Sequence, residues 1–272
     1  MIVCIDAGGT NTRIGVSRNG KSFINIEKFD TPQEFDKLIK LITASVGSER
    51  SQIEKISFGV AGIVDRKQGR IRWAPHKKNW NGVNAFENLK NTFPNTRMKI
   101  ENDANLATLG EAVFGAGKDY SIVSYLTLST GIGGGLVIDK KIVRTKSGFE
   151  PGHQIIHDHG EKWACGQIGC LESFASGTAF EKRFGMKGEE CEDGETWLKY
   201  AKDLAIGISN IIVLWSPEVI VLGGGVSSRF DYFIEPLKSE IKKLSSFADP
   251  PEIVKYKLSD PGLYGGLALS AD

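Results

Sequence analysis

The chain has 272 residues, of which 40% are hydrophobic and 25% are charged, so it is long enough to bury a substantial core in one large or two modest domains. Its 34 basic and 33 acidic residues nearly balance and form no long run of like charge, which argues against a nucleic-acid partner or an anionic membrane surface. No apolar stretch approaches the length of a membrane span, and the N-terminus does not resemble a signal peptide. These features predict a cytoplasmic protein whose partners are small molecules.

The first predicted elements are a hairpin and a helix. Residues 1–17 contain two apolar runs joined by a Gly-Gly-Thr-Asn turn at 8–11, which is typical of a β-hairpin. A helix should follow, with Thr31 as its N-cap, Pro32 in its first turn and Gly47 at its end.

The middle of the chain repeats the theme of its beginning. Residues 55–65 predict a strand that enters a glycine-rich loop. A short strand then meets a helix near Ala104, which places Asn102 and Asp103 at the junction. Residues 121–143 again show a strand, a glycine-rich turn and a strand, so we expect an internally duplicated architecture.

The second half is richer in helix. Residues 196–215 form a helical pattern so apolar that it should be largely buried, and residues 219–225 predict a buried strand ending in three glycines. Residues 185–195 are polar and contain glycine, so we expect a solvated loop in which Cys191 has no partner. The chain should close on a short helix over 260–272.

Three glycine-rich turns, at 8–10, 130–135 and 223–225, carry the first chemical signal. Glycine lets backbone amides approach an anion closely, because no Cβ intervenes. The second turn contains Gly-x-Gly, but a strand follows it where a dinucleotide-binding fold needs a helix, and the chain has no P-loop pattern. With these two folds excluded, the remaining interpretation is a nucleotide held between two hairpins, one from each of two duplicated domains.

Six motifs occur in the order and spacing of the ROK family of sugar kinases, which also includes repressors. They are "DAGGTNT" (6–12), "ENDANLATLGE" (101–111), "TLSTGIGGG" (127–135), "EPGH" (150–153), "CGQIGCLE" (165–172) and "VIVLGGG" (219–225). The chain resembles this family over essentially its whole length. The resemblance implies an α/β protein of the actin-like, ribonuclease H-like ATPase fold, with two duplicated α/β domains flanking a cleft. The small N-terminal domain would span 1–113 plus a C-terminal helix at 259–272, and the large domain would span 114–258.

The same resemblance implies ATP and Mg²⁺ as cofactors. Asp6 would hold Mg²⁺ through water, and the glycine-rich turns would cradle phosphate, with the third turn on the adenosine side. The implied nucleotide-binding residues are Asp6, Gly8, Gly9, Thr10, Thr130, Gly131, Gly133, Gly134, Gly224 and Gly225.

Asp103 matches the family's catalytic base. A carboxylate on the acceptor hydroxyl orients the oxygen and accepts its proton late in a loose phosphoryl-transfer transition state. The local sequence alone also allows Asp103 to serve as a helix N-cap. Sugar hydroxyls need paired donors and acceptors, and the implied sugar-binding residues are Gly62, Asn102, Asp103, Glu150, His153 and Glu172. Taken alone, Glu150 or Glu172 would suggest an exposed salt bridge.

The family's zinc site is incomplete in this sequence. The histidine of E-x-G-H and the three cysteines of C-x-C-G-x-x-G-C bind a structural zinc in the family, and the matching positions here are His153, Trp163, Cys165 and Cys170. One cysteine is therefore missing, although a structural zinc needs four ligands. Either His157 or His159 supplies the fourth ligand, or no zinc binds and Trp163 fills the space.

A second departure concerns the choice of sugar. Glucokinase-like members of the family usually carry A-P-N-L-P-G-W, where this chain has "APHKKNW" at 74–80, next to the expected sugar cleft. We expect an ATP-dependent kinase for the 6-hydroxyl of a hexose, with glucose as the first candidate and an N-acetylhexosamine or fructose as alternatives.

A sugar- and nucleotide-binding sensor without turnover is the alternative from another class, because the family includes repressors. Those repressors carry an N-terminal helix-turn-helix, whereas this chain begins at the first predicted strand, so we expect no DNA binding. A homodimer or homotetramer is expected by analogy with the family.

Overall fold

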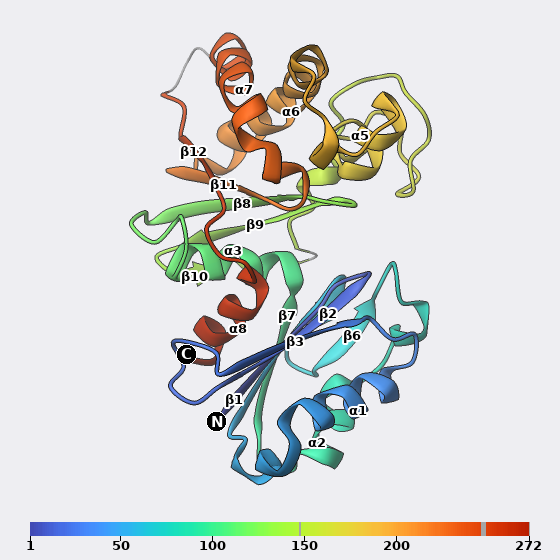
Figure 1. Cartoon of the computed structure of the whole chain (residues 1–272), viewed down its shortest axis with the longest axis vertical. Coiled ribbons are helices and arrows are strands. Elements are labelled where there is room, and N and C mark those ends of the chain that lie inside the picture. Colours follow the sequence, from blue (N-terminus) through green and yellow to red (C-terminus); the bar gives the residue numbers. More distant parts are fainter. Residues whose placement is uncertain (147, 246–248, 272) are drawn as a thin grey trace. The chain divides into compact units, whose positions relative to one another are not determined.

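The computed structural model describes residues 1–146, 148–245 and 249–271, which fold into two compact units (Figure 1). Unit 1 comprises Met1–Phe114, Lys146–Gly148 and Leu258–Asp272, and unit 2 comprises Gly115–Thr145 and Phe149–Lys257. The division differs from the expected one in that Phe114, the segment at 146–148 and Leu258 belong to the first unit. No helix in the described part of the chain is long and apolar enough to cross a membrane.

Unit 1 is built on a five-stranded sheet with the order β3-β2-β1-β4-β7. Its strands are β1 (Ile2–Ala7), β2 (Asn11–Ser17), β3 (Asn25–Asp30), β4 (Lys55–Val60) and β7 (Arg97–Asn102). The predicted hairpin of β1 and β2 is confirmed, and β1, β4 and β7 run parallel. Ala7 pairs with Val60, and Val60 pairs with Asn102, so the carboxyl ends of these three strands meet at one edge. The register places Asp6 and Asp103 at that edge.

Helices cover both faces of the unit 1 sheet. The remaining elements are α1 (Phe35–Val46), η1 (Gly47–Gln52), β5 (Ile63–Asp65), β6 (Arg70–Trp73), η2 (Lys78–Trp80), α2 (Ala85–Thr92), α3 (Asp103–Val113) and α8 (Pro261–Ala271). Val3 and Ile5 of β1 pack in the core with α1 and α2, whereas Cys4 packs with Leu263 and Leu267 of α8. Successive strand residues point to opposite faces, so these contacts place α1 and α2 on one face and α8 on the other.

The predicted start of the first helix is wrong. α1 begins at Phe35, and its N-cap, Glu34, makes no side-chain capping hydrogen bond. Thr31 is used elsewhere: its hydroxyl donates to the carbonyl of Gly8 at 2.9 Å and lies 3.0 Å from the Thr12 hydroxyl. The predicted end at Gly47 is confirmed, with a positive φ of 52°. Thr31 therefore braces the first glycine-rich turn.

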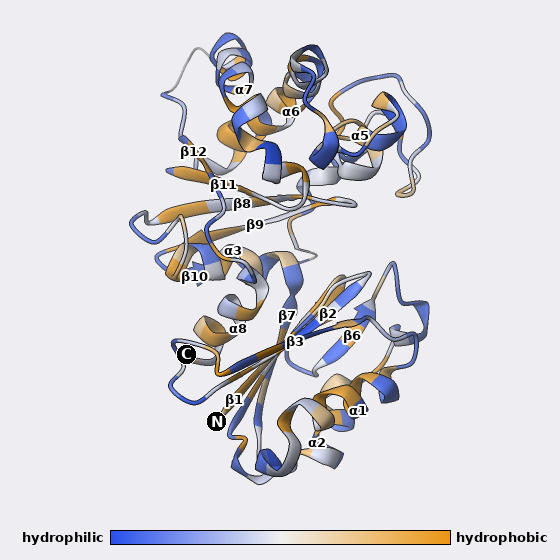
Figure 2. Cartoon of the chain, in the orientation of Figure 1, coloured by the Kyte–Doolittle hydropathy of each residue, from blue (hydrophilic) through white to orange (hydrophobic). Residues whose placement is uncertain are grey.

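Unit 2 repeats the topology of unit 1. Its sheet has the order β10-β9-β8-β11-β12, formed by β8 (Ile122–Leu128), β9 (Ile132–Ile138), β10 (Lys141–Ile142), β11 (Val219–Gly223) and β12 (Glu252–Lys255). β8 pairs antiparallel with β9 and parallel with β11, as β1 does with β2 and β4. Figure 2 shows that the inner strands β1 and β11 are mostly hydrophobic, as expected for strands covered on both faces. The predicted duplication is confirmed.

The core of unit 2 refines the prediction for residues 185–195. Its helices are η3 (Pro151–His153), α4 (Glu172–Ala175), α5 (Gly177–Phe184), η4 (Gly188–Glu190), α6 (Gly194–Trp215), η5 (Val226–Arg229) and α7 (Phe230–Leu244). Cys191 is fully buried in the cluster that includes Trp197 of α6 and Phe233 of α7, and the indole N–H of Trp197 donates to the Cys191 carbonyl at 3.2 Å. Gly188 and Cys191 therefore anchor the segment to the core, while its other residues are exposed, as expected. Cys191 has no disulfide partner, which also agrees with the expectation.

The close packing of α3 on α8 in unit 1 generates a stability prediction. A Cβ atom at Gly265 would lie 1.8 Å from the carbonyl oxygen of Leu106, so Gly265→Ala should force the helices apart and lower the free energy of unfolding by about 1–3 kcal/mol. Gly194→Ala is the control, because it places a methyl group at the start of α6 with nothing within 4 Å. Urea denaturation measures both variants, and equal midpoints for Gly265→Ala and the wild type would contradict the packing argument.

Candidate active site

A buried ion pair anchors the end of β7. Glu101 is fully buried, and the Arg66 guanidinium donates to both of its carboxylate oxygens, from Nε at 2.6 Å and from Nη2 at 2.5 Å. The amide of Asn102 and the Nδ2 of Asn105 also donate to Oε1, at 2.8 and 3.0 Å. These four hydrogen bonds offset the desolvation of the carboxylate and fix the junction between β7 and α3. No pattern in the sequence marks either member of the pair as functional.

Asn102, and not Asp103, is the N-cap of α3. The Oδ1 of Asn102 accepts from the amide of Asn105 at 3.0 Å, and its Nδ2 donates to the carbonyl of Gly62 at 3.1 Å. Gly62 has a φ of 145°, and a Cβ there would lie 2.1 Å from the carbonyl oxygen of Trp73. The structure thus brings Gly62 and Asn102 together and makes Asp103 the first residue of the helix, one position before the expected start.

Asp6 and Asp103 form a pair of carboxyl groups with raised pKa values. Burial raises the pKa of Asp103 to about 6, against smaller lowering effects of the amide of Ala104 and of His76. Burial, with a smaller contribution from the nearby charge of Asp103, raises the pKa of Asp6 to about 7. Arg13 lowers the pKa of Asp6, but it also forms an ion pair with Asp260, in which its Nε lies 2.9 Å from Oδ1. Two carboxylates in one poorly solvated region form a place where a cation would be stabilised.

The unusual segment at 74–80 packs on the first glycine-rich turn. A Cβ atom at Gly9 would lie 2.7 Å from Cδ2 of His76, so the imidazole rests directly on this glycine. The buried ammonium group of Lys77 donates to the carbonyl of Thr31 at 2.7 Å, and the Thr31 amide donates to the carbonyl of Thr10 at 2.8 Å. His76 therefore lies over the turn expected to hold phosphate and acts electrostatically on Asp103. The sequence marked the segment as a departure but did not place its histidine at the site.

In unit 2, Glu172 contacts the second glycine-rich turn. Its Oε2 accepts from the amide of Ile132 at 2.9 Å, and a Cβ atom at Gly131 would lie 2.6 Å from the same oxygen. The Thr178 hydroxyl donates to the carbonyl of Thr130 at 2.8 Å. A side chain at position 131 would therefore displace the Glu172 carboxylate.

The turn at 150–153 packs on β9, the second strand of the same hairpin. A Cβ atom at Gly152 would lie 2.2 Å from the carbonyl oxygen of Ile132, and one at Gly134 would lie 2.8 Å from Pro151. These contacts hold Glu150 and His153 next to β9. Glu172 contacts the first residue of the same strand, Ile132.

The third glycine-rich turn is explained by packing within unit 2. Gly224 has a φ of 88°, and a Cβ there would lie 2.4 Å from the carbonyl oxygen of Leu128. A Cβ at Gly225 would lie 2.3 Å from the carboxylate of Glu189. The turn is therefore close to the end of β8, and its role on the adenosine side stays a prediction.

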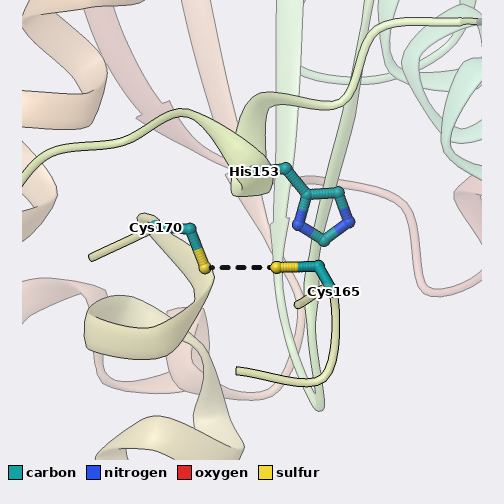
Figure 3. Close-up of side chains that lie close together, drawn as sticks. All are labelled: His153, Cys165 and Cys170. Carbon is teal, nitrogen blue, oxygen red and sulfur yellow. Dashed lines mark hydrogen bonds between the residues drawn. The ribbon is translucent and has the colours of Figure 1, made fainter. Parts of the chain in front are cut away.

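Three of the residues predicted to bind zinc converge. The ligand atoms of His153, Cys165 and Cys170 all lie within 4.8 Å of one another, and the two sulfur atoms are 3.8 Å apart (Figure 3). Zinc–sulfur bonds of about 2.3 Å at a tetrahedral angle give a sulfur–sulfur distance of about 3.8 Å. The Nδ1 of His153 is buried and has no hydrogen-bond partner among the described residues. The three residues fit three vertices of a tetrahedral zinc site.

Neither histidine proposed as the fourth ligand joins this group within the described part of the chain. The Nε2 of His157 is hydrogen-bonded to Asp203 at 2.8 Å, and Arg183 holds the other oxygen of Asp203 at 2.7 Å. His159 is exposed and contacts Asp158. The expectation that Trp163 merely fills space also needs correction, because its indole N–H donates to Oε1 of Glu172 at 2.9 Å.

Comparison with known proteins places the chain in a family. The sequence model of the ROK family matches residues 2–272, so the chain belongs to the ROK family. The glucokinase of Thermotoga maritima is 29% identical over an alignment of 308 residues that covers 98% of this chain and 96% of the relative. The xylose repressor of Caldicellulosiruptor bescii is 30% identical over 71% of this chain, which spans 55% of that repressor.

A solved structure supports the same assignment. The ROK family glucokinase from Streptomyces griseus, in complex with glucose and AMPPNP, superimposes with a TM-score of 0.82 at 25% identity, over 98% of each chain. Together with the repeated sheet topology, this likeness confirms the actin-like ATPase fold with two duplicated α/β units.

The raised carboxyl pKa values predict a pH dependence of stability. Because the pKa of Asp6 lies above its ordinary value of 3.8, its protonated form favours the folded state. This contribution is complete below pH about 4 and is lost as the pH rises through about 7. We expect the free energy of unfolding of Asp6→Asn to rise relative to that of the wild type over this range, measured by urea denaturation at several pH values. Asp36→Asn, at an exposed position of α1, is the control and should follow the wild type.

Proposed function

We propose that this protein is an ATP-dependent kinase that transfers the γ-phosphoryl group to the 6-hydroxyl of a hexose, with glucose as the first candidate substrate. The observation that carries the proposal is the pairing of Asp6 and Asp103 at the carboxyl edge of the parallel strands. The glucokinase relative and the glucokinase structure with glucose and AMPPNP support a sugar kinase that uses ATP.

Asp103 is the proposed base. Its position at the start of α3, next to the capping residue Asn102 and the backbone of Gly62, would let one carboxylate oxygen accept the proton of a sugar hydroxyl. Phosphoryl transfer has a loose transition state, so the main task of Asp103 is to orient the attacking oxygen. A pKa of about 6 leaves the group mostly ionised, and therefore able to accept a proton, at neutral pH.

The remaining sites follow from the same proposal. Asp6 would hold Mg²⁺ through water, and the ion would neutralise charge on the phosphates. The backbone of Gly8, Gly9 and Thr10 in unit 1 would contact phosphate, as would the hairpin from Thr130 to Gly134 in unit 2. Gly224 and Gly225 would lie on the adenosine side, and Glu150, His153 and Glu172 would bind sugar hydroxyls.

We also propose that zinc binds to His153, Cys165 and Cys170. The support is the sulfur–sulfur distance of 3.8 Å and the buried, unpartnered Nδ1 of His153. Coordination through Nδ1 would leave Nε2 of the same ring for a sugar hydroxyl. Three protein ligands leave the fourth ligand to water or another small molecule.

A sensor without turnover is the second candidate, favoured by the similarity to a xylose repressor. It requires the same sugar and nucleotide sites but no proton acceptor. The role of Asp103 therefore separates the two functions.

The first test is ADP release with Mg-ATP and a panel of glucose, N-acetylglucosamine, N-acetylmannosamine, mannose and fructose. We expect one sugar to stimulate release strongly and Asp103→Asn to lower kcat by roughly 10²- to 10⁴-fold. The kcat/KM of the wild type should fall as the pH drops below about 6, because the base becomes protonated. Asp36→Asn is the control and should retain activity. Sugar binding without ADP release would favour the sensor.

The zinc proposal is tested by elemental analysis of the purified protein. We expect one zinc per chain in the wild type and loss of zinc in Cys170→Ser, because a thiolate ligand is removed. Cys191→Ser is the control. Cys191 is buried in the core cluster with Trp197 and Phe233 and is not part of the ligand group. A wild-type protein without metal, when prepared in the presence of zinc, would contradict the proposal.

A further inference from the structure

Trp163 connects the segment that carries the cysteines to Glu172. Its indole N–H donates to Oε1 of Glu172 at 2.9 Å, while Oε2 of the same carboxylate accepts from the amide of Ile132 at 2.9 Å. The carboxylate is therefore held from two sides, by a side chain on one oxygen and by the tip of the β8–β9 hairpin on the other. Hydrogen bonds to an ionised acceptor are among the stronger ones in proteins.

Trp163 is itself held firmly. Its amide donates to the carbonyl of Gln167 at 2.8 Å, and its carbonyl accepts from the amide of Gly166 at 2.8 Å, which closes a tight turn around Cys165. The ammonium group of Lys182 lies 5.9 Å from the centre of the indole ring, within the range of a cation–π contact. The indole therefore has a fixed direction before any ligand binds.

The two bonds leave the carboxylate able to bind a ligand. An ionised carboxylate offers about four acceptor positions, and the bonds from Trp163 and Ile132 use two of them, one on each oxygen. The remaining positions have fixed directions because both oxygens are held. Two adjacent sugar hydroxyls need such a pair of oriented acceptors, and a carboxylate that rotated freely would lose rotational entropy on binding.

We propose that Trp163 is a positioning residue for sugar binding, and that its indole N–H orients the Glu172 carboxylate toward the sugar hydroxyls. The inference rests on the proposed function, because it assumes that Glu172 binds the substrate. Trp163 thus has a role in the site that does not require it to bind metal, although it stands where the family has a zinc ligand.

Trp163→Phe tests the inference, since it removes the N–H and keeps most of the ring. We expect the KM for the preferred sugar to rise about tenfold with kcat within about twofold of the wild type, because one charge-assisted hydrogen bond is lost. The zinc content should match that of the wild type. An unchanged KM in an active enzyme would overturn the inference.

Trp197→Phe is the matched control. Trp197 also donates its indole N–H within unit 2, but to the carbonyl of Cys191 and not to Glu172. This variant should lower the melting temperature and leave the KM unchanged. A rise in KM equal to that of Trp163→Phe would show a general loss of stability and would overturn the inference.

A double-mutant comparison shows whether Trp163 acts through Glu172. If it does, Trp163→Phe in the background of Glu172→Gln should raise the KM by less than twofold beyond that of Glu172→Gln alone. Independent, multiplicative effects of the two substitutions would contradict a shared role.

A spectroscopic measurement separates this inference from the proposed function. The chain contains five tryptophans, so labelling with ¹⁵N-tryptophan gives a small set of indole signals, and Trp163→Phe identifies one of them. We expect Glu172→Ala to shift the Trp163 signal and to leave the Trp197 signal in place. If the hydrogen bond is present but no sugar in the panel is phosphorylated, the proposed function fails; if sugars are phosphorylated and the signal does not move, the positioning role fails.

Discussion

The carboxyl pair of Asp6 and Asp103, both half-buried at the edge of the sheet, is the constraint on which the candidate site of unit 1 depends. Parallel pairing of β1, β4 and β7 brings the ends of the outer two strands to the same edge, so neither carboxyl can be moved without changing the register. Burial and mutual repulsion raise the pKa of Asp6, and the nearby Arg13 is partly neutralised by Asp260. These groups leave a local negative charge that a divalent cation would relieve, which supports the proposed Mg²⁺ site.

The two units use the same topology for different tasks. In unit 1 the sheet edge carries ionisable groups, and the fully buried Glu101 with Arg66 fixes the strand end that presents them. In unit 2 the matching hairpin is held by the Thr178 hydroxyl on the carbonyl of Thr130 and by the Glu172 carboxylate on the amide of Ile132. Glu172 is the charged group there, and hydrogen bonds from neighbouring groups hold it. The fold supplies the scaffold twice, and local side chains determine the chemistry.

Local patterns in the sequence predicted the elements better than the contacts between them. The hairpins, the duplication and the end of α1 at Gly47 follow from periodicity and glycine, which act within a few residues. The false N-cap at Thr31 shows the limit, because its hydroxyl bonds to Gly8, 23 residues earlier in the chain. The burial of Cys191 next to Trp197 was not visible in the sequence either, because its neighbours along the chain are polar. Partners that are distant in sequence, such as Arg66 and Glu101, produce no periodic pattern that would reveal their contact.

The candidate site shows the same division between what motifs specify and what packing decides. Motif matching located Asp103, His153 and Glu172 but could not say which side chains hold them. It also treated Trp163 only as a missing ligand, because a motif records identity at a position and not the direction in which a side chain bonds. The indole reaches Glu172, nine residues later, while Cys165, two residues on, faces the other metal-ligand candidates. A substitution in the ligand set that the family motif predicts can therefore add a contact to the proposed substrate site, because both sets of residues lie on one short segment.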